Sequence, residues 1–173
     1  MSNDDRDYSF LSEALPQVQE YLLSNQLYWP LSASQPRLTV GAVLLALARL
    51  EVKLPSDAQT LRSYLDSLRS KWRTAWEKKA AREISNRLML WSNYLADFEN
   101  DPQQAADGYG SEVRGRVILQ LLLFETPDVP DAQALVELDA VLKTRLRPGE
   151  FLWGASLETV FPRTDFWFLY GKL

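Results

Sequence analysis

The chain has 173 residues, of which 46% are apolar and 24% are charged, and its formal net charge is -4. This length and composition are typical of one globular domain and exclude a disordered or fibrous chain. Histidine and cysteine are both absent, which excludes imidazole acid–base catalysis, thiol nucleophiles, disulfides and metal sites built from imidazole or thiolate.

The first residues are acidic. Residues 1–8 read as an acidic, flexible leader, and they lack the basic flank and apolar stretch of a secretory signal. The longest apolar runs, 40–48 and 117–124, are far shorter than the roughly 20 residues that cross a bilayer. We therefore expect a cytoplasmic protein without a membrane partner.

Apolar residues recur at helical spacings through most of the chain. A short helix is expected from Ser12 or Pro16 to about Leu23. A second helix is expected from Thr39 to about Val52, with Thr39 as its N-cap. Because the second helix is apolar on nearly every side, it is predicted to be surrounded by other helices.

Residues 56–101 contain neither glycine nor proline, so one helix from Asp57 to Phe98 is conceivable. The apolar positions of this segment form two series with a nine-residue step from Ala75 to Ile84, which rotates the second series around the helix relative to the first. We predict a kink or a change of packing partner over 76–83. A complete break into two helices is the alternative.

The second nearly all-apolar helix is expected between Ser111 and Glu125, and a further helix from Asp131 to Leu146, with Asp131 placed to cap it. The predicted fold is an all-α, single-domain bundle of five or six helices over residues 1–173. Its two nearly all-apolar helices are expected to be the central ones.

The C-terminal segment, residues 150–173, loses the helical spacing and contains seven of the twenty aromatic residues. We expect it to pack on the bundle as a non-helical segment. A short β-hairpin that pairs 157–161 with 166–170 is one form it could take. Ordering such a segment costs backbone entropy, so its aromatic side chains are expected to be core.

The basic stretch between Arg62 and Arg87 holds eight basic and three acidic residues, a net charge of +5, which leaves -9 for the rest of the chain. Trp72 and Trp76 lie on its apolar series and are expected to point inward. Basic side chains that flank a core edge most often meet acidic neighbours. The candidate contacts with a partner or with phosphate are Arg62, Arg69, Arg73, Lys78 and Arg82.

The aromatic residues offer a second candidate surface. Trp29, Trp153 and Trp167 would form an aromatic interface if they were exposed, because aromatic side chains are enriched where proteins bind one another.

No motif indicates catalysis. The acidic residues from Asp97 to Asp107 do not fit a calcium loop, because position six is Pro102 and position twelve is Gly108. The stretch Gly108–Glu112 could open a phosphate-binding helix, but it lacks a preceding strand and places Glu112 where an anion would bind. We therefore assign no catalytic, cofactor-binding or metal-binding residue.

The function expected from these observations is that of a non-catalytic protein-interaction module: an adaptor, a regulator or a small subunit of a larger assembly. A protein partner is expected. The alternative is a nucleic-acid-binding subunit that contacts phosphates through the basic stretch 62–87. An enzyme or a small-ligand carrier that uses the interior of the bundle is the third hypothesis.

Overall fold

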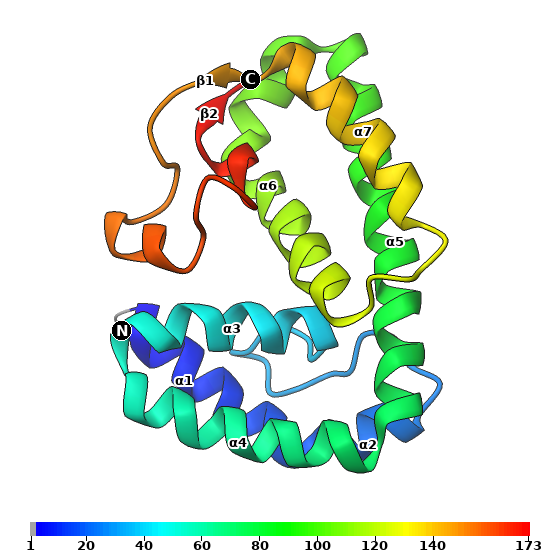
Figure 1. The fold of residues 1–173 in the computed structure, drawn as a ribbon, viewed down its shortest axis with the longest axis vertical. Helices are drawn as coiled ribbons and strands as arrows, with labels where there is room; N and C mark the ends of the chain where they lie inside the picture. The colour runs from blue at the N-terminus through cyan, green and yellow to red at the C-terminus, as the bar shows by residue number, and fades with distance from the viewer. Residues whose placement is uncertain (1–2) are drawn as a thin grey trace. The chain divides into compact units, whose positions relative to one another are not determined.

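A computed structural model describes residues 3–173 and confirms the all-α class (Figure 1). Six helical segments make up this part of the chain, because α1 and α2 are joined without a break by a 3-10 turn at Leu15–Gln17. The α-helices are α1 (Asn3–Ala14), α2 (Val18–Leu23), α3 (Val40–Lys53), α4 (Pro55–Lys71), α5 (Arg73–Asn100), α6 (Pro102–Glu125) and α7 (Ala132–Arg145).

The chain divides into two compact units, which we call unit 1 (Met1–Glu83) and unit 2 (Ile84–Leu173). Each unit contains one of the two helices predicted to be central, α3 in unit 1 and α6 in unit 2. The single domain predicted over residues 1–173 stays a prediction.

Helix α3 forms the centre of unit 1, where it packs against α1 and α4 (Figure 1). Every residue from Val40 to Ala48 is buried, which confirms the prediction that this helix is enclosed. Thr39 is its N-cap, as predicted, and the Thr39 hydroxyl accepts a hydrogen bond of 3.0 Å from the Ala42 amide.

Within residues 3–173, none of the helices combines the length and apolar character of a membrane span.

The N-terminal segment corrects the predicted leader of residues 1–8 and the predicted helix start at Ser12 or Pro16. Helix α1 begins at Asn3, and residues 1 and 2 lie outside the described part of the chain. Asp7 is buried in α1 and accepts a hydrogen bond of 3.0 Å from Nε of Arg49 on α3. This ion pair joins α1 to α3, so an acidic residue that was predicted to lie in a flexible leader is packed within unit 1.

The helix break between α4 and α5 lies at Trp72, so neither the kink predicted over 76–83 nor the alternative of a complete break falls where the helix is interrupted. Trp72 leaves the helical conformation, with φ -116° and ψ 35°, and α5 is helical throughout 76–83. Trp76 and Ala80 are buried residues of unit 1, whereas Ile84 begins unit 2. The boundary between the units after Glu83 agrees with the predicted change of packing partner along this helix.

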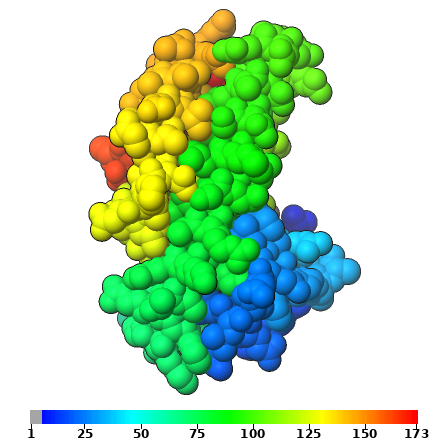
Figure 2. Space-filling model, turned by 90° about the vertical axis from the view of Figure 1, so that its right-hand side faces the viewer, coloured from blue at the N-terminus to red at the C-terminus, as the bar shows by residue number. Residues whose placement is uncertain are grey.

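Unit 2 contains the second part of α5 together with α6 and α7, and Figure 2 shows α7 (yellow to orange) along the surface of this unit beside α5 (green). Helix α6 begins nine residues before the predicted Ser111, because the side chain of Asp101 accepts the Gln104 amide at 3.1 Å and Pro102 occupies the first turn. Helix α7 begins after Asp131, but the Asp131 side chain accepts a hydrogen bond from Ser85 and does not cap the helix.

The C-terminal segment packs as predicted but not as the expected hairpin. It forms two 3-10 turns, Ala155–Thr159 and Trp167–Leu169, and the short antiparallel sheet pairs β1 (Arg147–Pro148) with β2 (Gly171–Lys172). A Cβ atom on Gly171 would lie 2.5 Å from the carbonyl oxygen of Arg147, so the close approach of these strands requires glycine.

Three phenylalanine rings anchor this segment. Phe161, Phe166 and Phe168 are at most 3% exposed, and the Tyr109 hydroxyl of α6 donates a hydrogen bond of 2.6 Å to the Phe168 carbonyl. Figure 1 shows the segment (orange to red) beside α6. The prediction that its aromatic residues are core holds for these three rings. Trp167, by contrast, is only half-buried.

Candidate binding site

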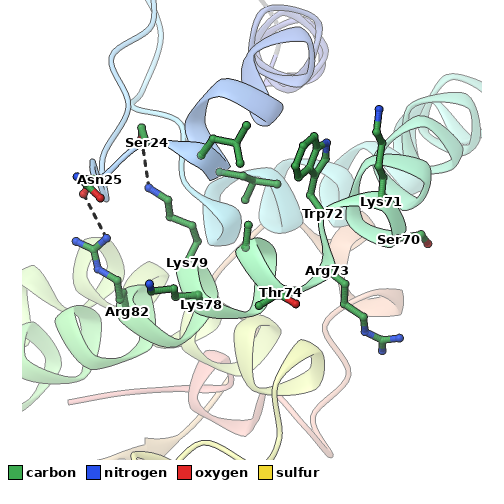
Figure 3. Close-up of a pocket in the computed structure, with 13 residues that line it drawn as sticks. Ser24, Asn25, Ser70, Lys71, Trp72, Arg73, Thr74, Lys78, Lys79 and Arg82 are labelled. Atoms are coloured by element: carbon green, nitrogen blue, oxygen red, sulfur yellow. Dashed lines mark hydrogen bonds between the residues drawn. The ribbon is translucent and has the colours of Figure 1, made fainter.

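A pocket of about 890 Å³ lies in unit 1, between the end of α2 and the junction of α4 with α5 (Figure 3). Five basic side chains and no carboxylate occur among the described residues that line it. The thirteen lining residues are Leu22, Leu23, Ser24, Asn25, Ser70, Lys71, Trp72, Arg73, Thr74, Ala75, Lys78, Lys79 and Arg82. The pocket is therefore a concentrated positive region in a chain of negative net charge.

The α4–α5 junction positions one side of the pocket. The Trp72 amide still donates to the Leu68 carbonyl at 2.9 Å, and the Trp72 carbonyl accepts the Trp76 amide, also at 2.9 Å, as the first hydrogen bond of α5. Because the chain leaves the helical conformation at Trp72, Thr74 and Ala75 stand in the first turn of a new helix. Backbone amides in a first turn have no acceptor within their own helix.

Lys79 fixes the opposite side of the pocket by binding the loop that follows α2. Its Nζ atom donates to Oγ of Ser24 at 3.3 Å and to the Gln26 carbonyl, and it lies 4.5 Å from the centroid of the Tyr21 ring. The residue is 3% exposed. Burial first, and the nearby Arg82 second, lower the pKa of Lys79.

Arg82 holds the same loop one residue away. Its Nη1 atom donates to the Asn25 carbonyl at 3.2 Å, and Figure 3 shows Lys79 and Arg82 both extending toward the loop. Two neutral backbone carbonyls and one hydroxyl therefore hold these two cations in place. None of these three hydrogen bonds uses a carboxylate, so neutral acceptors fix the loop wall.

Glu83, the last residue of unit 1, secures α5 against α3. Its carboxylate accepts the Thr39 hydroxyl at 2.7 Å and the Gly41 amide at 2.9 Å, and the residue is fully buried. A carboxylate at the start of a helix is stabilised by the amides and by the helix dipole. The contact fixes the part of α5 that carries Lys78, Lys79 and Arg82.

Lys71 and Lys78 have neither an ion pair nor a hydrogen bond to the described residues, whereas Lys79 and Arg82 lack an ion pair but bind the loop. Both side chains are exposed. The Nζ atom of Lys71 lies 5.6 Å from the centroid of the Trp72 ring, and Nε1 of Trp72 is buried without a hydrogen-bond partner. These two ammonium groups are therefore available to an anion that enters the pocket.

The structure gathers only some of the predicted contact residues into the pocket. Arg73, Lys78 and Arg82 line it, whereas Arg62 and Arg69 do not. Arg62 donates to Glu51 at 2.6 Å and Arg69 donates to Asp66 at 3.0 Å.

The pocket also contains residues that were not predicted as contacts. Lys71 and Lys79 belong to the basic stretch, and the loop at Ser24–Gln26 contains no charged residue. The segregated basic charge was the signal that pointed to α4 and α5. Nothing in the sequence indicated that a loop about 50 residues earlier in the chain lines the same pocket.

The three tryptophans of the predicted aromatic interface are half-buried, and each contacts its own unit. Trp29 in unit 1 donates from Nε1 to the Gln17 side chain at 2.9 Å. In unit 2, Trp153 packs edge-on against Phe161, and Trp167 stacks edge-on against Phe168 with the Nζ atom of Lys143 above its ring. Their role as an interface stays a prediction.

Within the part of the chain that the structure describes, no group of three or more acidic side chains is arranged to hold a metal ion. Comparison of the chain with models of protein families, with curated proteins and with solved structures found no match.

Proposed function

We propose that the protein is a non-catalytic interaction module that binds an acidic segment of a partner protein in the pocket of unit 1. The observation that carries this proposal is a pocket of about 890 Å³ whose described lining holds five basic side chains and no carboxylate. Pockets of about 300–1,000 Å³ are typical of sites that enclose a ligand. Clusters of basic residues are a recurrent means of recognising acidic peptide segments.

The apolar part of the lining supports a peptide ligand. Leu22, Leu23 and Trp72 line the pocket together with the cations, and Leu23 is 57% exposed. An acidic segment could bury apolar side chains against these groups while separate acidic residues meet Lys71 and Lys78, which Figure 3 shows extending away from each other. Mixed apolar and charged surfaces of this kind are common in protein interfaces.

The nucleic-acid alternative is less well supported, because the basic side chains do not form a continuous track. Arg62, Arg69 and Arg73 are each paired with a carboxylate of the same unit. A nucleic-acid strand needs a row of free cations that follows its phosphates. The basic side chains of α4 and α5 that have no carboxylate partner instead lie around the lining of one pocket.

NMR titration of the ¹⁵N-labelled full chain tests the proposal. The probes are a degenerate peptide library with a fixed central run of glutamates, the same library with glutamines, and an oligothymidylate, all at about 150 mM salt to screen weak surface attraction. We expect the glutamate library alone to shift the amides of Thr74 and Lys78 and the indole of Trp72.

The variant Lys71→Glu/Lys78→Glu should lose at least about tenfold in affinity for the glutamate library, because it replaces attraction by repulsion. Arg37→Glu is the matched control, since Arg37 is an exposed cation of unit 1 outside the pocket. Absence of glutamate-library binding, or equal loss in the control, would overturn the proposal. Tighter binding of the oligothymidylate would favour the nucleic-acid alternative.

A further inference from the structure

We propose that unit 2 contains a second binding site, which takes a small apolar molecule that carries one carboxylate. The site is a pocket of about 500 Å³ beside the β1–β2 sheet. Every described residue that lines it belongs to unit 2, so this proposal is independent of the function proposed for the pocket of unit 1.

Two parts of unit 2 form the walls of this pocket. One wall is a face of the first turns of α6, where Ala106 follows Pro102 at the four-residue spacing of a helix. The other wall is the β1–β2 sheet together with Leu152, and Figure 1 shows the two strands beside the first turns of α6. The hydrogen bond of 2.6 Å from the Tyr109 hydroxyl to the Phe168 carbonyl ties the C-terminal segment to α6. The two walls are therefore held together by a buried contact.

The register of the sheet brings two cations to the same pocket. Arg147 and Lys172 are direct partners across β1 and β2, and both residues line the pocket. Side chains at directly opposed positions share one face of a sheet, with Cβ atoms about 4.5–5.5 Å apart. Neither side chain has an ion pair or a hydrogen bond to the described residues. Because like charges at opposed positions destabilise a sheet, an anion bound between these two cations would stabilise it.

The charge of the lining matches a monoanion. Arg147 and Lys172 contribute two positive charges and Asp107 one negative charge, so the side chains of the described lining have a net charge of +1. The planar guanidinium group presents paired N–H donors that match the two oxygens of a carboxylate. A dianion would bring its second negative charge into a pocket that already contains Asp107.

The remaining lining favours an apolar body for the ligand. Phe98 and Leu152 are half-buried, so each leaves apolar area that a ligand would remove from water. Small-molecule sites typically enclose about 300–1,000 Å³ and combine an apolar lining with a few polar groups that orient the ligand. The cross-strand pair of cations is such an orienting group, and a carboxylic acid with an aliphatic or aromatic body fits both parts of the lining.

Isothermal titration calorimetry of the full chain tests the proposal with three probes that share one alkyl chain: octanoate, octanamide and octyl phosphate. The titrations are made at about 150 mM salt to screen weak surface attraction. We expect octanoate to bind at least about tenfold more tightly than octanamide, because only the carboxylate forms charge-assisted hydrogen bonds with the two cations. Octanoate should also bind more tightly than octyl phosphate, which approaches a dianion at neutral pH.

The variant Lys172→Glu separates binding from folding. It places a carboxylate opposite Arg147, so the cross-strand pair becomes attractive: the melting temperature should rise while octanoate binding is lost. Arg147→Gln should weaken octanoate binding at least about tenfold and leave octanamide binding unchanged. Lys143→Gln is the matched control and should change neither, since Lys143 is an exposed cation of unit 2 outside the pocket.

Several results would overturn the proposal. Equal affinity for octanoate and octanamide would show that the two cations do not recognise the carboxylate. Unchanged octanoate binding by Lys172→Glu, or a lower melting temperature of this variant, would refute the argument from opposed charges. Tighter binding of octyl phosphate would refute the preference for a monoanion. A degenerate peptide library that ends in a free leucine carboxylate is the last probe, and if it bound more tightly than octanoate the assignment to a small molecule would be wrong.

Discussion

The fully buried Phe168 ring should be the most sensitive single position of the C-terminal segment. The ring is 0% exposed, packs edge-on against Phe166 at 6.0 Å, and lies 4.2 Å from the guanidinium carbon of Arg116. Arg116 is itself 2% exposed and forms an ion pair with Asp139. The substitution Phe168→Ala would therefore remove both the apolar filling and the aromatic face that supports a buried cation.

The expected loss follows from the buried area. A phenylalanine ring that buries about 150 Å² contributes about 4 kcal/mol at about 25 cal/mol per Å². This agrees with the roughly 3–5 kcal/mol measured when buried aromatic residues are replaced by alanine. The backbone carbonyl of residue 168 remains, so the hydrogen bond from Tyr109 can persist. We expect the free energy of unfolding to fall by about 3–5 kcal/mol.

Urea unfolding followed by far-UV circular dichroism measures this loss, and hydrogen exchange shows whether it is confined to unit 2. Trp167→Ala is the matched control, because it removes a neighbouring ring that is only half-buried. The control should lose about 1–2 kcal/mol, in proportion to the smaller buried area. An equal loss in both variants, or a loss below about 1 kcal/mol for Phe168→Ala, would refute the assignment of this ring to the core.

Three further predictions concern polar groups. Thr39→Ala should lower the free energy of unfolding by about 2 kcal/mol in urea, because it removes the cap of α3 and a hydrogen bond to buried Glu83, whereas Thr39→Ser should retain most of it. Asp139→Ala should cost about 3–5 kcal/mol by leaving Arg116 unpaired, and a double-mutant cycle with Arg116→Met should recover most of that loss. Burial raises the pKa of Tyr94 from 10.0 to about 12. The protonated phenol therefore stabilises the fold below pH 10, and this stability should decline as the pH rises toward 12. Absorbance at alkaline pH should show the late ionisation of this phenol, which Tyr94→Phe should abolish.

Short sequence patterns predicted the helix end that depends on one capping residue. Thr39 caps α3 because a hydroxyl residue precedes an apolar run, and the structure has this hydrogen bond. The predicted start of α6 at Ser111 is wrong, although Asp101 and Pro102 together are a strong start signal for a helix.

Burial of charged residues could not be read from the sequence. Lys79 and Glu83 are charged residues outside the two apolar series of this segment, yet both are buried in unit 1. Their burial depends on partners elsewhere in the chain, namely the loop after α2 for Lys79 and the start of α3 for Glu83. The pocket depends on the same long-range contacts, so the sequence identified its basic side and could not identify its other wall.

The way in which Lys79 and Arg82 are held also has a kinetic consequence. Their hydrogen bonds go to carbonyl and hydroxyl oxygens, which fix the side chains without cancelling their positive charge. A concave site lined by charges of one sign focuses its electric field into the solvent and accelerates the arrival of oppositely charged ligands. The two cations that build the wall can therefore attract an anion over a distance, even though the groups available to bind it are others. Association with such a site is fast at low ionic strength and slows steeply as salt is added.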